Sequence, residues 1–298
     1  MVDQSAYEVG STRRVITLFF GDTHGGHKLG LLNPLVTLFD LDERGNRVPY
    51  HPELTSVQRY LWSCFQEDLG EVEEIADGDE IIVIHVGDLG HGTKYTEQLV
   101  STRPADQVLI AVGNMEPTLN LPNVKRMRII HGTQAHTFGE STIPIITAGF
   151  LDAKYSNVDV SSLAHGLFEV DGLEIDCAHH GPSPGIRTWT TGNRLRLYVR
   201  SVMQDSLENG EDPPGVFIRS HYHTGIHETV RRETNRGHFK TEAFILPSYC
   251  GLSEYAQQAT RSKYLISNGM LALVIEGGEL VEYYKLWRSV DLRTRESL

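Results

Sequence analysis

Several features that define other protein classes are scarce or missing in this sequence. It has three cysteines, Cys64, Cys177 and Cys250, whose spacing fits no metal site and which cannot all pair. We therefore expect buried, reduced thiols that pack as small hydrophobic residues. No apolar run approaches the roughly 18 residues of a membrane-spanning helix, and the N-terminus lacks the layout of a signal peptide. These absences predict a soluble, cytoplasmic protein with no membrane partner.

Positive charge is also in short supply. The 298 residues include 27 Lys and Arg against 39 Asp and Glu, which gives a formal net charge of -12. Extended binding of nucleic acid requires clustered Lys and Arg opposite the phosphates, so the charge balance argues against it. An acidic total is compatible with carboxylates gathered to hold metal ions.

Apolar runs alternate with helical patterns in the first half of the chain. We predict strands at 14–20, 80–86 and 107–112, and helices at 56–76 and about 95–102. The strand candidates are continuously apolar, which is typical of strands buried on both faces of a parallel sheet. The stretch at about 25–51 has no clear periodicity, and its length indicates a surface loop or a lid.

The second half is richer in strands, and the predicted ones include RMRII, LEIDCA and GVFIRS. It contains one amphipathic helix at about 192–208 and ends in a predicted hairpin, MLALVIE-GG-ELVEYYKLW, with a two-residue glycine turn. No repeat or low-complexity linker divides the chain. We therefore expect residues 1–298 to form a single domain with two sheets.

Five of the predicted strands end in side chains that can bind metal. These endings are Asp22-Thr-His24, Gly87-Asp88, Gly113-Asn114, His180-Gly181 and His221-Tyr-His223. Each pattern alone is common in turns, and an H-x-H on a strand puts both imidazoles on one face. Ligands in open α/β sheets bind beyond the carboxyl ends of the strands. Five such endings in one chain therefore indicate a metal site.

The ordered series D-x-H, G-D, G-N, H-G and H-x-H, from Asp22 to His223, resembles the calcineurin-like metallophosphoesterases. The resemblance implies an α/β (α+β) fold, a four-layer αββα sandwich of two mixed sheets flanked by helices. It also implies a two-metal centre at the edge that the sheets share. Asp22, His24 and His223 would bind one ion, Asn114, His180 and His221 the other, and Asp88 would bridge them.

The residue types fit this chemistry. Carboxylate, amide and imidazole ligands together suit Mn²⁺ first, with Fe, Zn²⁺ or Ni²⁺ as alternatives. Two such ions, about 3.5–4 Å apart, can activate a hydroxide and stabilise the charge on a phosphoryl group. The predicted function is therefore a dinuclear metal-dependent phosphoesterase acting on a small phosphorylated or nucleotide-type substrate.

The third motif departs from the family pattern, which has a histidine after the asparagine. This chain has Met115 there, and a thioether cannot donate a proton. Substrates whose leaving group needs little protonation would then be favoured, so we predict phosphodiesters rather than monoesters. His91, His27 and Glu116 are the candidate replacement acids.

Other assignments concern the motif His179-His180-Gly181 and the loop after it. The family pattern selects His180, immediately before the glycine, as the ligand. Strand alternation turns His179 to the opposite face, where it would pack or would support a ligand by a hydrogen bond. In the following loop, Arg187 could hold a phosphate and Trp189 could stack on a base.

Two alternatives to the leading function stay open: a metal-dependent DNA nuclease, and a non-catalytic scaffold that keeps the fold for binding. The sequence specifies neither the substrate nor the oligomeric state.

Overall fold

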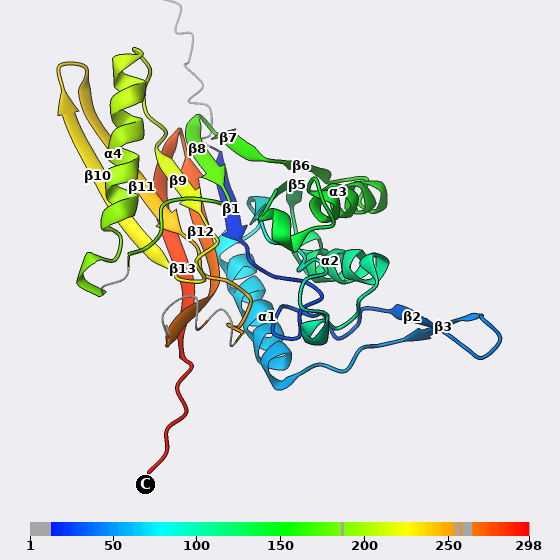
Figure 1. Ribbon diagram of the computed structural model, residues 1–298. Coiled ribbons are helices and arrows are strands. Elements are labelled where there is room, and N and C mark those ends of the chain that lie inside the picture. Colours follow the sequence, from blue (N-terminus) through cyan, green and yellow to red (C-terminus); the bar gives the residue numbers. More distant parts are fainter. Residues whose placement is uncertain (1–12, 186–187, 254–256, 258–263, 298) are drawn as a thin grey trace, which may run out of the picture.

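The computed structural model describes residues 13–185, 188–253, 257 and 264–297. Within these ranges the strands form two large sheets and one two-stranded hairpin (Figure 1). No helix in the described part of the chain is long and apolar enough to cross a membrane.

The first sheet has six strands in the order β13-β12-β1-β4-β5-β6. β1, β4, β5 and β6 run parallel, and the two C-terminal strands extend the sheet in antiparallel fashion. The bounds are β1 Arg14–Phe20, β4 Glu80–Val86, β5 Val124–Ile130, β6 Asp159–Leu163, β12 Leu265–Glu276 and β13 Glu279–Asp291.

The second sheet has five strands in the order β10-β11-β9-β8-β7. β9 is parallel to both of its neighbours, and the outer pairs are antiparallel, so this sheet is mixed as well. The bounds are β7 His165–Val170, β8 Leu173–Ala178, β9 Val216–Arg219, β10 Ile226–Thr234 and β11 Gly237–Ile245.

In the described part of the chain, four α-helices cover the outer faces of the two sheets (Figure 1). One apolar cluster packs α1, α2 and α3 against the first sheet, a second fills the space between the sheets, and a third packs α4 on the second sheet. This arrangement is the predicted αββα sandwich, and the mixed α/β fold class is confirmed. The bounds are α1 Ser56–Ala76, α2 Pro104–Leu119, α3 Thr142–Lys154 and α4 Asn193–Glu208.

Several local predictions are confirmed with their physical causes. Helix α1 begins at a capping box in which Thr55 and Gln58 exchange side-chain and backbone hydrogen bonds. The C-terminal hairpin turns at Gly277 and Gly278, whose φ angles of 61° and 82° belong to the left-handed region that a tight hairpin turn requires. All three cysteines are buried and free.

The predicted strand at 107–112 is wrong, because these residues lie in helix α2. Pro104 occupies its first turn, where a missing N–H costs nothing, and the buried Val108, Ala111 and Met115 recur at helical spacing. The third parallel strand is β5 instead. The helix predicted at 95–102 is also wrong, since only a 3₁₀ turn forms there, at Thr96–Gln98.

The predicted insertion at about 25–51 contains two different parts. Its first part is mostly buried and includes His27, Leu31 and Leu32. The rest holds the hairpin of β2 Leu38–Leu41 and β3 Arg47–Tyr50, which extends away from the body of the molecule (Figure 1). A lid function for this segment stays a prediction.

A buried carboxylate in the second sheet gives a first testable prediction. Glu242 accepts hydrogen bonds from His227 and Thr229, both at 2.7 Å, and pairs with Lys240 at 2.9 Å. Burial raises its pKa, but these partners outweigh burial and lower it to about 2. The carboxylate therefore stabilises the fold above its unfolded pKa near 4.5, and this stabilisation is lost as the pH falls towards 2.

Glu242→Gln should accordingly lower the free energy of unfolding at pH 7 by about 1–2 kcal/mol, a figure reduced for partial solvent screening. Urea unfolding of wild type and variant at pH 7 and pH 3 checks this, with the exposed Glu233→Gln as control. The difference in unfolding free energy between wild type and Glu242→Gln should be smaller at pH 3 than at pH 7. An equal difference at both pH values would contradict the stabilising role of the Glu242 carboxylate.

Candidate metal centre

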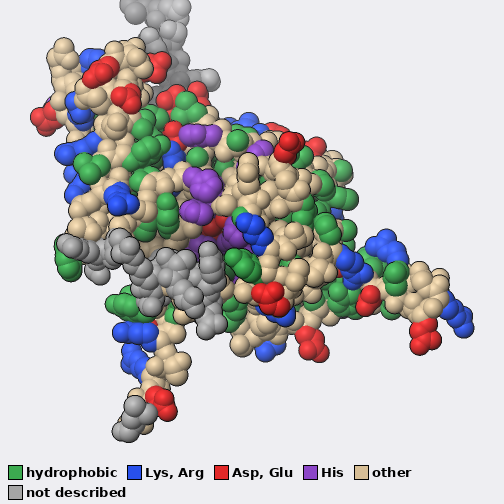
Figure 2. All heavy atoms as spheres, viewed as in Figure 1, with side chains coloured by type: hydrophobic (Ala, Val, Ile, Leu, Met, Phe, Trp, Pro, Cys, Tyr) green, Lys and Arg blue, Asp and Glu red, His purple; other side chains and the backbone are tan. Residues whose placement is uncertain are grey.

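The ends of five strands meet at one edge of the sandwich. Backbone hydrogen bonds connect these ends: the Asp22 amide donates to Gly87, the His24 amide to Asp88, and the Ser220 amide to His179. Side chains from four of these ends form overlapping groups of possible metal ligands, and Figure 2 shows histidines gathered in the middle of one face. Four of the five predicted strand-end motifs therefore come together.

The first group contains Asp22, His24 and His223. The Nε2 atoms of the two histidines are 3.3 Å apart. Asp22 Oδ1 lies 3.8 Å from His24 Nε2 and 3.5 Å from His223 Nε2. Asp22 Oδ2 accepts from the Ser220 hydroxyl and the His221 amide. Oδ1 is buried and has no hydrogen bond among the described residues. Three donor atoms thus face one small volume.

The second group contains Asp22, Asp88, His179 and His221. His179 Nδ1 donates to the Val86 carbonyl at 2.8 Å, which leaves Nε2 directed at Asp88 Oδ2, 3.1 Å away. The same carboxylate oxygen lies 3.9 Å from His24 Nε2 in the first group. Asp88 therefore stands between the two groups, where a bridging carboxylate would have to lie.

The prediction that His179 turns to the face opposite the site is wrong. Strand β8 ends at Ala178, so the alternation of faces does not extend to the two histidines. His179 is buried beside Asp88, whereas the exposed His180 joins a group with His179 and His221. Both neighbours thus lie at the site, and His179 is the more enclosed.

The backbone at the site is unusual. Among the described residues, eleven that are not glycine have positive φ, and five of these are Asp22, His24, Asp88, His221 and His223. Such conformations cost free energy and gather at functional sites. They also show that His221 and His223 lie beyond the strand, so the two imidazoles reach different groups rather than one shared face.

Two glycines permit the strand ends to approach one another. A Cβ at Gly87 would lie 2.4 Å from His179 Nδ1, and a Cβ at Gly132 would lie 2.2 Å from the Asp88 amide nitrogen and Oδ1. Gly132 follows β5 and precedes Thr133, whose amide donates to Asp88 Oδ1 at 2.6 Å. The third strand end is therefore Gly132-Thr133.

The electrostatics of the site favour a cation. Burial raises the pKa of Asp22 and of Asp88, but the adjacent His179 in particular outweighs burial, and both pKa values are lowered. Burial lowers the pKa of His179, yet Asp88 and Asp22 raise it to about 9. Two enclosed carboxylates thus attract positive charge to the space between them.

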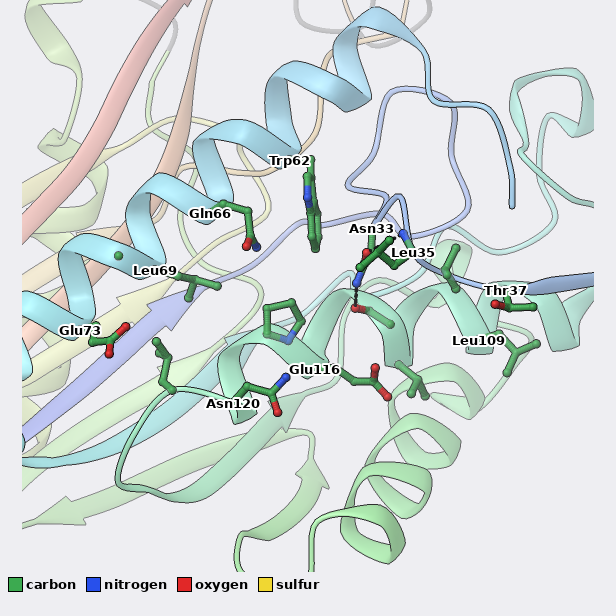
Figure 3. Close-up of a pocket in the computed structure, with 16 residues that line it drawn as sticks. Asn33, Leu35, Thr37, Trp62, Gln66, Leu69, Glu73, Leu109, Glu116 and Asn120 are labelled. Atoms are coloured by element: carbon green, nitrogen blue, oxygen red, sulfur yellow. Dashed lines mark hydrogen bonds between the residues drawn. The ribbon is translucent and has the colours of Figure 1, made fainter. Parts of the chain in front are cut away.

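Asn114 and Glu116 do not lie at this edge, and their assignment to the site is wrong. Asn114 is fully buried in α2, where its amide accepts from the Asn33 backbone and donates to the Leu31 carbonyl. Glu116 pairs with Lys154 and lines a cavity of about 750 Å³ between α1 and α2 (Figure 3). Met115 packs in the core, so it replaces no catalytic histidine.

The structural role of Asn114 gives a second prediction. Asn114→Leu leaves two buried backbone groups without their partners, which should cost about 2–6 kcal/mol of unfolding free energy, or about 1–3 kcal/mol for each group. The folded variant should still bind as much metal as wild type, as measured by plasma mass spectrometry after gel filtration. Loss of bound metal from a folded Asn114→Leu protein would restore Asn114 as a ligand.

Histidines outside the predicted ligand set line one side of the site. His91 Nδ1 lies 3.3 Å from His24 Nδ1, and His136 Nδ1 lies 3.0 Å from the His91 carbonyl oxygen. Burial and the neighbouring His27 lower the pKa of His91 to about 3, which keeps it neutral and able to accept from His24. This contact can fix the His24 tautomer that directs Nε2 into the first group. The acid role of His91 and His27 stays a prediction.

Thr133 and His136 were missed by the sequence reasoning. A signal existed, because RMRII is a predicted strand that is followed at once by His131-Gly132-Thr133. Of the two predicted substrate contacts, Arg187 lies outside the described residues. Trp189 lies in a 3₁₀ turn and its side chain is 78% exposed.

The residues present fit a divalent metal centre. Imidazole and carboxylate atoms of the two groups converge, and Asp22 Oδ1 is a buried acceptor with no hydrogen bond to any residue that the structure describes. Imidazole and carboxylate ligands suit first-row divalent ions. The described residues therefore form a buried His/Asp cluster that can bind metal.

Comparisons with known proteins add little to this geometry. No protein-family model and no curated protein matches the chain. Among solved structures, the chain is similar to a conserved uncharacterized protein, a predicted phosphoesterase, from Streptococcus pneumoniae TIGR4. That similarity covers 93% of this chain and 98% of the other, at 11% identity and a TM-score of 0.28.

Proposed function

We propose that this protein is a metal-dependent phosphoesterase with a dinuclear centre at the shared edge of its two sheets. One observation carries the proposal: Asp88 Oδ2 lies 3.1 Å from His179 Nε2 and 3.9 Å from His24 Nε2, so one carboxylate faces two groups of ligands. Asp22, His24 and His223 would hold one ion. Asp88, His179 and His221 would hold the second, with His180 at its open side.

The chain's own residues prepare this centre before any substrate arrives. The Ser220 hydroxyl and the His221 amide donate hydrogen bonds to Asp22 Oδ2 and hold that carboxylate in place. The Thr133 amide holds Asp88 in the same way through Oδ1. The Val86 carbonyl accepts from His179 Nδ1 and so fixes the tautomer of His179. Such contacts orient ligands and reduce the reorganisation that binding would otherwise need. The bound ions would supply Lewis-acid chemistry, stabilising the negative charge that develops on a phosphoryl group.

The proposal covers both classes of phosphate ester. The predicted preference for diesters depended on Met115 standing where the family has an acid. Because Met115 is fully buried in the helical core, that reason no longer applies. Manganese is the first ion to test, because the site mixes imidazole with carboxylate.

The test is hydrolysis of p-nitrophenyl phosphate and bis(p-nitrophenyl) phosphate by purified protein loaded with Mn²⁺. We expect metal-dependent turnover of at least one ester, and its loss in His221→Ala. His238→Ala is the matched control, because that side chain is exposed on β11, outside the metal-binding groups.

A third assay measures cleavage of DNA by the Mn²⁺-loaded protein over a range of salt concentrations. Cleavage of DNA without turnover of the small esters would replace this proposal by the nuclease alternative. A protein that binds two Mn²⁺ ions and hydrolyses none of these substrates would be a scaffold, and the enzymatic proposal would be wrong.

A further inference from the structure

Thr133 lies among the ligands of the second group. Its Oγ1 is 3.3 Å from Asp88 Oδ2, 3.4 Å from His179 Nε2 and 3.4 Å from His221 Nδ1. All of these atoms belong to side chains that would bind the second ion of the proposed function. The Thr133 hydroxyl, which follows strand β5, is thus the side-chain group from the third strand end that lies at the proposed metal centre.

Hydrogen bonding alone does not account for this position. A threonine hydroxyl has one proton to donate, and the carboxylate oxygen that could accept it, Asp88 Oδ2, lies 3.3 Å away. The distance to the carboxylate exceeds the roughly 2.7–2.8 Å of an ordinary O–H···O hydrogen bond. The tight hydrogen bond of Thr133 to Asp88 is made by its backbone amide, at 2.6 Å.

The distances agree better with ligands of a common ion. Two donor atoms that each lie about 2.1 Å from one ion, at angles of about 90–109°, are about 3.0–3.4 Å apart. The pair His24 Nε2 and His223 Nε2 in the first group shows the same spacing, 3.3 Å. The Thr133 hydroxyl stands to Asp88, His179 and His221 as these two imidazoles stand to each other.

We infer that the Thr133 hydroxyl is a direct ligand of the second metal ion, in the place where the sequence pattern had suggested the amide of Asn114. This inference rests on the proposed metal centre, but not on its hydrolytic activity. A neutral alcohol is a weaker donor than carboxylate or imidazole. The second ion is therefore bound more weakly than the first. A substitution at Thr133 changes the affinity for the second ion and leaves the affinity for the first unchanged.

The first experiment measures binding of Mn²⁺ by calorimetry. Thr133→Val removes the oxygen at constant shape and should weaken the second binding step about 10- to 100-fold, leaving the first step unchanged. Thr133→Ser should remain within about threefold of wild type. Thr118→Val is the matched control, because Thr118 is a fully buried threonine in α2, outside the site. Unchanged binding in Thr133→Val would overturn the inference.

The second experiment separates a ligand from a residue that only orients Asp88. Thr133→Cys loaded with two equivalents of Co²⁺ should show a thiolate-to-cobalt charge-transfer band that wild type and Thr118→Cys lack. A cobalt-loaded Thr133→Cys protein without this band would show that residue 133 does not touch the ion. Both readouts are independent of turnover, so an inactive enzyme with the band would refute the proposed function and leave this inference intact.

Discussion

Replacing Asp88 with asparagine is expected to abolish hydrolysis and to remove most of the second metal ion. Asp88 is 3% exposed, and its Oδ2 faces His179 at 3.1 Å and His24 at 3.9 Å. The amide keeps the shape of the side chain but removes the negative charge that the two proposed ion positions would share. Loss of one partner from a buried charged set costs about 3–5 kcal/mol, which corresponds to at least a hundredfold weaker binding.

Two measurements check this result: metal content after gel filtration, and initial rates with whichever phosphate ester wild type hydrolyses. Asp205→Asn is the control, since Asp205 is exposed on α4. We expect the control to match wild type in both. An Asp88→Asn protein that keeps two ions and at least a tenth of the rate would show that Asp88 is not shared between them.

Removal of both metal ions should lower the melting temperature by about 10–20 °C. An ion present at a hundred times its Kd stabilises the fold by about 2.7 kcal/mol, and two ions act together. For a chain of this size, 1 kcal/mol corresponds to about 2–4 °C. The physical source is the pair of buried carboxylates, Asp22 and Asp88, whose repulsion is no longer neutralised when the ions leave.

Calorimetric melting of Mn²⁺-loaded protein with and without excess chelator measures this shift. The chelator should move the melting temperature of Asp88→Asn much less, because that variant has less bound metal to lose. Equal melting temperatures for loaded and stripped wild-type protein would contradict the prediction.

Much of the fold follows from the sequence, because apolar runs and turn signals are local. The runs at Arg14–Phe20 and Glu80–Val86 form strands, and helix α1 begins at Ser56 as expected. The candidate ligands at the ends of β1, β4, β8 and β9 could be identified, since a strand end is visible wherever an apolar run stops.

The third strand end could not be identified in the same way. The run at 107–112 is short and apolar, and such a run does not distinguish a strand from a buried helix. Because this run was predicted as a strand, Asn114 was assigned as a ligand and Met115 was placed where the family has a catalytic histidine. In the structure both side chains are buried in α2. The conformation beyond the strands was equally hidden, because positive φ at His221 and His223 depends on the completed site.

The most direct measurement is a crystal structure of the protein grown with Mn²⁺, with diffraction data recorded at the manganese absorption edge. The metal-centre proposal predicts two anomalous peaks, both beside Asp88, one among Asp22, His24 and His223 and the other among His179, His221 and Thr133. Absence of both peaks from this cluster in metal-saturated crystals would contradict it.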